Sequence, residues 1–240
     1  MHRQIVTVKN YNELCVRVAE ETHAISQAAF AQYGRFTMAL SGGSTPKGIH
    51  AAMVDKKFEW ENIHFFLGDE RWVPIDNNRS NAKMIDETLI QPGHIPADHF
   101  HPVETNTESP DSSAELYEKE LSHFFNVKRP QFPQFDLILL GLGDDGHTAS
   151  LFPGTIALNE TKRWVVSNTA AGIPEPRVSF TYPMINNARN VFFIVSGKGK
   201  AAMMKKIFEE NADVPAAKVN PANGTMKWFV DADAAGELHK

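Results

Sequence analysis

The chain has almost no cysteine, no long apolar run and no excess of basic residues. Its single cysteine, Cys15, excludes a disulfide within the chain and is typical of proteins of reducing compartments. No window approaches the roughly 20 apolar residues that a helix needs to span a bilayer. Residues 1–6 also lack the apolar core of a signal peptide. We therefore expect a cytoplasmic protein that has no membrane partner.

Positive charge is scarce too, with 24 lysines and arginines against 29 acidic residues and a net charge of −5. This balance gives no basic surface for nucleic acid, so we expect no nucleic-acid partner. An anionic small molecule would need local positive side chains. The 240 residues suffice for one sizeable hydrophobic core. We expect residues 1–240 to form a single domain, as a monomer or a weak homodimer.

Short buried strands alternate with amphipathic helices along the chain. Apolar runs predict strands at 36–40, 63–67, 135–140, 164–166, 178–180, 191–195 and 227–230. Apolar residues at helical spacing predict helices over 11–33, 46–54, 112–125 and 199–210, whereas 91–109 has the composition of an irregular loop. The alternation predicts an α/β fold with one mostly parallel, Rossmann-like sheet and helices on both faces.

Polar turns follow four of these strands, at 41–46, 68–71, 141–150 and 196–200. The carboxyl ends of parallel strands lie on the same edge of a sheet, and open α/β sheets bind their ligands beyond that edge. We therefore expect the four turns to converge on one crevice.

The first turn has the sequence Ser41-Gly42-Gly43-Ser44-Thr45-Pro46. Its glycines let the backbone approach a ligand closely, and its hydroxyl side chains add hydrogen-bonding groups. Thr45 before Pro46 predicts a helix N-cap, and the helix start offers free N–H groups and about half a positive charge. This combination suits a phosphate. The alternative is a plain strand-to-helix turn.

The third turn has the sequence Gly141-Leu142-Gly143-Asp144-Asp145-Gly146-His147-Thr148. Its glycines match the dinucleotide fingerprint, but Asp144 and Asp145 would stand where a pyrophosphate needs positive or neutral partners. A histidine beside an aspartate can transfer protons near neutral pH. We interpret Asp145 and His147 as an acid–base pair. The alternative is that His147 is a surface or helix-capping residue.

Positive side chains accompany these turns. The second turn places Arg71 after Asp69 and Glu70, and this guanidinium could polarise a carbonyl or hold an anion. Arg177 opens a strand, and Lys200 lies near a helix start, where its charge opposes the helix dipole. A lysine so placed is easier to explain if it serves an anion. Arg177 and Lys200 could equally be solvated surface charges.

Ten histidines raise the question of a metal site. His94, His99 and His101 cluster in the 91–109 loop, but they lack the paired spacing of a zinc site on regular structure. We expect no metal.

Taken together, the turns resemble the 6-phosphogluconolactonase family. The resemblance rests on residues 41–46, 68–71, 141–153 and 197–201 and extends over nearly the whole chain. Its most specific part is the string Asp-Gly-His-Thr-Ala-Ser-Leu-Phe-Pro at 145–153. The resemblance implies a sugar-phosphate isomerase-like α/β fold. It also implies hydrolysis of 6-phospho-D-glucono-1,5-lactone to 6-phosphogluconate, the second step of the oxidative pentose phosphate pathway, without a metal or organic cofactor.

Glucosamine-6-phosphate deaminases share this fold and similar turns. In that family a glutamate follows the histidine by five residues and supports ring opening, and a tyrosine follows the Asp-Glu pair. This chain has Phe152 and Arg71 at these positions, which favours the lactonase. A non-catalytic sugar-phosphate sensor is a further alternative, although this chain keeps both the phosphate turn and the acid–base pair.

The residues and the resemblance together predict the site. We expect His147, Asp145 and Arg71 to be catalytic, and substrate and phosphate to be bound by Ser41, Gly42, Gly43, Ser44, Thr45, Asp69, Glu70, Arg177 and Lys200. Neutral His147 would remove a proton from the water that attacks the lactone carbonyl. Arg71 or backbone N–H groups would stabilise the oxyanion, and Asp145 would orient the imidazole or the water.

Overall fold

Seven parallel strands form the central sheet of the protein, which a computed structural model describes over residues 4–56 and 58–239. In order across the sheet they are β1 (Gln4–Val8), β10 (Thr225–Asp231), β9 (Asn190–Val195), β6 (Leu137–Leu140), β2 (Phe36–Leu40), β3 (Ile63–Leu67) and β5 (Phe100–His101). All neighbouring strands pair in parallel. The predicted α/β fold with a mostly parallel sheet is confirmed.

The central strands are covered on both faces, since every residue of β2 and β6 is buried. Strands that are covered on both sides have nearly continuous apolar sequences, which is why the sequence alone located them. In the core, the Trp228 indole of β10 stacks on the Phe193 ring of β9 with centroids 3.8 Å apart.

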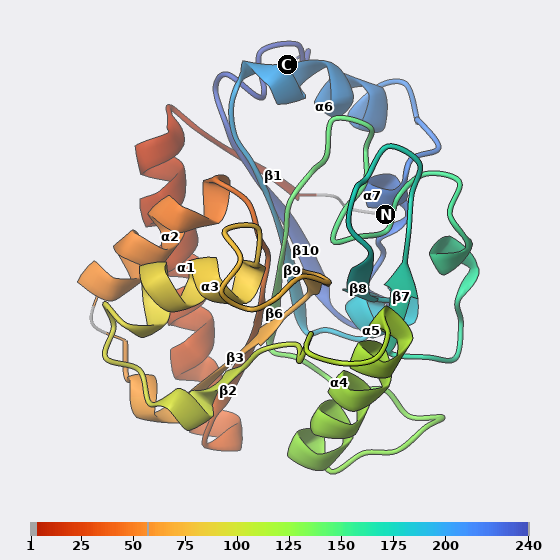
Figure 1. Ribbon diagram of the computed structural model, residues 1–240. Coiled ribbons are helices and arrows are strands. Elements are labelled where there is room, and N and C mark those ends of the chain that lie inside the picture. The colour runs from red at the N-terminus through yellow and green to blue at the C-terminus, as the bar shows by residue number, and fades with distance from the viewer. Residues whose placement is uncertain (1–3, 57, 240) are drawn as a thin grey trace.

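Helices cover both faces of the central sheet, as predicted. α1 (Tyr11–Tyr33) and α2 (Thr45–Asp55) lie on one side, and α5 (Tyr182–Asn186) lies on the other (Figure 1). The remaining helices are α3 (Asn81–Ile85), which continues into a π-helical turn at Asp86–Ile90, α4 (Pro110–Phe125), α6 (Ala201–Phe208) and α7 (Pro215–Lys218). In the described residues, no helix has both the length and the apolar character needed to cross a membrane.

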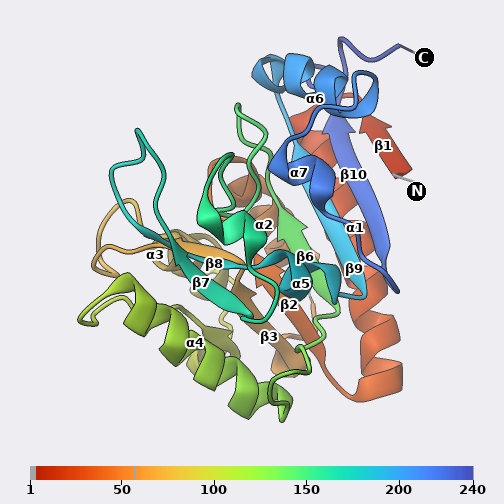
Figure 2. The same cartoon turned by 90° about the vertical axis from the view of Figure 1, so that its right-hand side faces the viewer.

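A second sheet of three antiparallel strands lies beside the first, formed by β4 (Asp69–Arg71), β8 (Arg177–Phe180) and β7 (Val165–Asn168). α4 packs against it (Figure 2). The strands expected at 164–166 and 178–180 are therefore present, but they do not join the parallel sheet. β7 and β8 pair with each other in antiparallel fashion. A parallel pair would need a crossover of a dozen or more residues, and the segment 169–176 that joins them is shorter.

Several local expectations were wrong. Ser44, not Thr45, precedes the first residue of α2, and its side chain makes no capping hydrogen bond within the described residues. The segment 91–109 is not wholly irregular, because it contains β5. β1, β4 and α3 were not expected at all. The strands β1 and β5 form the two edges of the sheet and are only partly buried, so their apolar pattern in the sequence is weak.

The strand order brings the four polar turns together. β9, β6, β2 and β3 are consecutive in the sheet, so the turns that follow them lie side by side at its carboxyl edge. The expectation that these turns converge is confirmed.

Candidate active site

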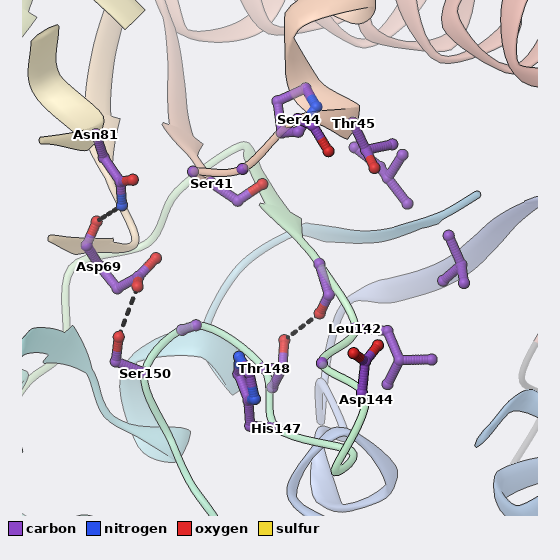
Figure 3. A pocket seen from close by; sticks show the side chains of 18 of the residues that line it. Ser41, Ser44, Thr45, Asp69, Asn81, Leu142, Asp144, His147, Thr148 and Ser150 are labelled. Carbon is purple, nitrogen blue, oxygen red and sulfur yellow. Dashed lines mark hydrogen bonds between the residues drawn. The ribbon is translucent and has the colours of Figure 1, made fainter. Parts of the chain in front are cut away.

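A cavity of about 380 Å³ lies at the carboxyl edge of the central sheet, and all four turns line it. Figure 3 shows the 41–45 turn facing the loop that carries His147. The expected site residues that line the cavity are Ser41, Gly42, Gly43, Ser44, Thr45, Asp69, Arg71, His147, Arg177 and Lys200. Its size falls within the roughly 300–1,000 Å³ of small-molecule sites. Asp145 and Glu70 were expected at the site but do not line the cavity.

The 41–45 turn packs tightly and keeps an unused hydroxyl group. A Cβ on Gly42 would overlap the Asn81 side chain, whose Nδ2 donates a hydrogen bond to the Asp69 carbonyl at 2.9 Å. Ser41 Oγ is buried and has no hydrogen-bond partner within the described residues. A buried polar group without a partner is unfavourable, so this hydroxyl is available to a ligand.

The first turn of α2 is held from the opposite side by Tyr11 of α1. Its hydroxyl donates to the Thr45 carbonyl at 2.9 Å and accepts a hydrogen bond from the Gly48 N–H at 3.0 Å. These two bonds fix the N-terminal end of α2 beside the cavity. The partial positive charge of that helix end therefore has a defined position.

His147 and Asp145 form a hydrogen-bonded pair. The two groups are joined by a bond of 2.6 Å between His147 Nδ1 and Asp145 Oδ1, and the His147 backbone N–H donates to the same oxygen at 3.0 Å. Partial burial raises the pKa of Asp145, but these hydrogen bonds outweigh burial and hold that pKa below its usual value. An ionised Asp145 keeps the ring proton on Nδ1, which leaves Nε2 as an acceptor.

Two neighbours fix the plane of the His147 ring. A Cβ on Gly143 would overlap the imidazole, so the ring occupies space that only glycine leaves open. On another side, the ring centroid of Phe152 lies 4.7 Å from that of His147. Phe152 is buried and carries no proton-transfer group, so Asp145 is the ionisable partner of the ring.

Two arginines lie directly opposite each other on adjacent strands of the small sheet, since Arg71 of β4 pairs with Arg177 of β8. Arg177 Nη1 donates to the carbonyl of Glu175 at 2.8 Å, and Arg71 Nη1 donates to the carbonyl of Arg79 at 2.6 Å. Burial and the nearby Arg71 charge lower the pKa of Arg177. Two guanidinium groups in one cavity favour an anionic ligand.

Asp69 supplies a carboxylate to the same cavity, where its Oδ2 accepts a hydrogen bond from Ser150 Oγ at 2.6 Å. On the other side, Lys200 Nζ donates to Asp144 Oδ1. The Lys200 side chain is 27% exposed and that of Asp144 is 87% exposed. The cavity therefore carries both carboxylates and cationic groups, which suits a polar ligand.

Glu70 is turned away from the cavity. Successive side chains of a strand point to opposite faces, and the neighbours of Glu70 in β4 are the ones that line the cavity. Its carboxylate accepts hydrogen bonds from the backbone N–H groups of Asn81 at 2.8 Å and Ala82 at 2.7 Å, and from Ser80 Oγ at 3.1 Å. Burial raises its pKa. Glu70 therefore holds the N-terminus of α3.

Sequence reasoning missed Asn81 and Ile173, which line the cavity from outside the four turns. Thr148, Ser150 and Ser196 lie in the expected turns and also line the cavity, but they were not named as site residues. Asn81 follows Ser80, whose side chain accepts from the Lys83 N–H at 3.2 Å, so a helix N-cap signal was present but was not used. Ala149 also lines the cavity and has a φ of 46°, which is uncommon for a residue with a Cβ. Strained backbone of this kind collects at functional sites.

Two histidines of the 91–109 segment contact other groups. His101 Nδ1 is hydrogen-bonded to the carboxylate oxygen Oε1 of Glu120 at 2.8 Å, and His101 Nε2 lies 3.2 Å from His64 Nδ1. His99 Nδ1 lies 3.1 Å from the carbonyl of Trp60. Across residues 4–56 and 58–239, no group of three or more His, Cys, Asp or Glu residues is placed to hold a metal ion.

Known proteins resemble this chain in sequence and in fold. The profile of the family described as "Glucosamine-6-phosphate isomerases/6-phosphogluconolactonase" matches residues 9–228. The 6-phosphogluconolactonase of Synechocystis sp. is 44% identical over 213 residues, which are 88% of each chain. The solved structure of 6-phosphogluconolactonase from Trypanosoma brucei matches with a TM-score of 0.88 and 31% identity over 99% of both chains. A monomeric glucosamine-6-phosphate deaminase matches with a TM-score of 0.81 over 98% of this chain and 99% of its own. Its 19% identity shows the fold alone.

Proposed function

The chain belongs to the family of glucosamine-6-phosphate isomerases and 6-phosphogluconolactonases, and on this premise we propose that it hydrolyses 6-phospho-D-glucono-1,5-lactone to 6-phosphogluconate. This reaction is the second step of the oxidative pentose phosphate pathway. One observation carries the proposal. His147, hydrogen-bonded to Asp145, lines a cavity that is also lined by the N-terminal end of α2, two arginines and a lysine. The cytoplasmic location and the monomeric or weakly dimeric state stay predictions.

In this proposal the 41–45 turn receives the substrate phosphate. The partnerless Ser41 hydroxyl and the N-terminal end of α2 support this assignment. Lys200 and Arg177, which line the same cavity, supply the positive charges. The lactone ring then extends from the phosphate toward His147.

His147 acts as the general base. Its Nε2 takes a proton from a water molecule while the water oxygen attacks the C1 carbonyl of the lactone. The oxyanion is stabilised by Arg71 or by backbone N–H groups of the glycine turn. The bond between C1 and the ring oxygen then breaks, and His147 returns the proton to that oxygen. General-base catalysis contributes about 10²–10⁴-fold, and one oxyanion donor about 10²–10³-fold.

Asp145 acts through His147 in this proposal. Asp145 does not line the cavity. Its hydrogen bond to Nδ1 holds the imidazole in the tautomer that leaves Nε2 free to accept a proton. This is the orienting role expected from the sequence. An active-site aspartate of this type also stabilises the imidazolium that forms when the base takes up a proton.

Two other functions make different predictions. A deaminase would release ammonia from glucosamine 6-phosphate, and a sensor would bind sugar phosphates without turnover. The packing of Phe152 against His147, where the deaminase family has a glutamate, argues against the deaminase. The paired His147 and Asp145 argue against a sensor, which has no need of a proton acceptor.

The purified chain and freshly generated 6-phosphogluconolactone distinguish these functions. Acid release should rise far above the spontaneous hydrolysis of the lactone, and ammonia release from glucosamine 6-phosphate should be absent. Phosphogluconate binding without accelerated acid release would instead support the sensor. Ammonia release would support the deaminase.

A further inference from the structure

An ion pair lies inside the candidate site, and one of its two members, Asp144, has no role in the proposed chemistry. Lys200 Nζ donates to Asp144 Oδ1, and both residues line the cavity. The two turns come together because β6 and β9, which precede them, are neighbours in the sheet. We propose that Asp144 competes with the anionic group of the ligand for Lys200 and thereby sets the affinity of the cavity for phosphorylated compounds. The inference rests on the proposed function, in which Lys200 binds the phosphate.

Asp144 differs from the other carboxylates near the cavity because, within the described residues, its only hydrogen-bond partner is the Lys200 side chain. Asp145 accepts hydrogen bonds from His147, and Asp231 accepts from Ser196 Oγ and the Gly197 N–H. The side chain of Asp144 is 87% exposed, and within the described residues its carboxylate accepts only the bond from Lys200. The charge of Asp144 is thus free to leave Lys200 without breaking the turn.

The ammonium group of Lys200 is stabilised by a nearby anion both with and without a ligand in the cavity. It immediately precedes Ala201, the first residue of α6, so its positive charge faces the positive end of the helix dipole. Its side chain is only 27% exposed, which limits its stabilisation by water. Asp144 supplies the compensating negative charge when the cavity holds no ligand.

A phosphate at the same ammonium group would meet the carboxylate of Asp144 at close range. Like charges within a few ångströms repel, and the exposed, singly bonded Asp144 is the group that can move away. Binding of a phosphate therefore includes the loss of the Asp144–Lys200 pair. Ligands without a phosphate leave the pair intact.

Replacing Asp144 by asparagine tests this competition. Loss of an exposed ion pair changes an equilibrium constant by about two- to five-fold. Removing the repulsion between the Asp144 carboxylate and the bound phosphate adds to this change. We expect Asp144→Asn to tighten the binding of inorganic phosphate and of 6-phosphogluconate by about three- to ten-fold in isothermal titration at low salt. The gain should shrink as the ionic strength rises, because salt screens the repulsion.

Asp213→Asn is the matched control. Asp213 is 85% exposed and pairs with Lys218 at 2.9 Å, and neither residue lines the cavity. Both variants change the net charge of the chain by the same amount, but only Asp144→Asn should tighten binding. Equal gains in the two variants would show an effect of net charge and overturn the inference. Weaker or unchanged phosphate binding by Asp144→Asn would overturn the inference too. A failure of both this variant and the unmodified chain to bind phosphate would also overturn it.

A double-mutant cycle shows whether Asp144 acts through Lys200. Lys200→Ala should weaken phosphate binding, and adding Asp144→Asn to it should give much less gain than in the unmodified chain. A gain of the same size in both backgrounds would mean that Asp144 repels the phosphate directly, and the proposed competition would be wrong.

Turnover separates the inference from the function on which it rests. Asp144→Asn should lower KM for 6-phosphogluconolactone by a larger factor than KM for unphosphorylated glucono-1,5-lactone. Equal factors for the two lactones would count against the inference. If the unmodified chain does not hydrolyse the phosphorylated lactone, the proposed function fails, and the phosphate titrations still decide whether Asp144 competes for Lys200.

Discussion

The imidazole of His147 lies so close to the backbone of Gly143 that a Cβ at residue 143 would overlap the ring at Nδ1. The Gly143 N–H also donates to the His147 carbonyl at 2.8 Å, which closes the turn. His147 Nδ1 is the atom that is hydrogen-bonded to Asp145 Oδ1. Gly143 therefore provides the space in which the proposed base and its carboxylate partner are aligned, a role unlike that of a glycine in a dinucleotide fingerprint.

Gly143→Ala should lower kcat by about 100-fold, because a displacement of the order of 1 Å at the reacting group has effects of this size. Steady-state kinetics with the phosphorylated lactone would measure it, and circular dichroism would verify that the variant is folded. Gly199→Ala is the control, since a Cβ there has open space around it and Gly199 does not line the cavity. Comparable losses of activity in the two variants would contradict the alignment role of Gly143.

His147→Ala should lose about 10²- to 10⁴-fold in kcat, the usual contribution of a general base, while substrate binding is largely kept. Lys200→Ala and Arg177→Ala should mainly raise KM, because these cations serve the ground state and the transition state alike. Steady-state kinetics separate the two effects. A near-normal kcat in His147→Ala would refute the assignment of His147 as the base.

Glu70→Gln should destabilise the protein by about 1–3 kcal/mol, since an amide group cannot accept all the hydrogen bonds that the carboxylate accepts from the start of α3. Thermal or urea unfolding would measure the loss. If Glu70 instead binds substrate, as the sequence suggested, the variant should raise KM and leave the unfolding transition in place.

His50 should make the protein less stable in mild acid. Burial lowers its pKa from 6.5 to about 4. Since this pKa lies below that of the unfolded chain, the unfolded chain takes up a proton first as the pH falls below 6.5. Stability is therefore lost between pH 6.5 and about 4 and is then constant with respect to this group. The loss is up to about 3 kcal/mol at roughly 1.4 kcal/mol per pKa unit.

His50→Gln should make the dependence of the free energy of unfolding on pH less steep in that interval, as measured by urea unfolding at several pH values. His64, whose pKa is also lowered to about 4, keeps part of the slope. The slope is the readout, so a general loss of stability does not obscure it. An NMR titration of the unmodified protein gives a second test. A His50 imidazole that takes up its proton near pH 6.5 would contradict the prediction.

The sequence by itself determined the central strands and the turns that follow them. The apolar runs of β2, β3, β6 and β9 are local patterns, and each is followed by glycine and polar residues that must lie at the carboxyl end of its strand. The carboxyl ends of parallel strands lie on the same edge of a sheet. These local patterns therefore predicted that the 41–45 turn lies beside the loop of His147. The resemblance on residues 145–153 then indicated lactone hydrolysis as the reaction.

Tertiary structure alone decided which side chains of these turns face the cavity. Glu70 is turned away because Asp69, Glu70 and Arg71 form a strand whose side chains alternate, a strand that exists only through its pairing with β8. The same pairing sets Arg71 opposite Arg177.

The Asp144–Lys200 pair likewise joins turns that are 56 residues apart. Such contacts depend on strand order and register, which arise from packing across the whole chain. No local pattern of residues encodes them, and this is the physical reason why the sequence located the site but not its internal geometry.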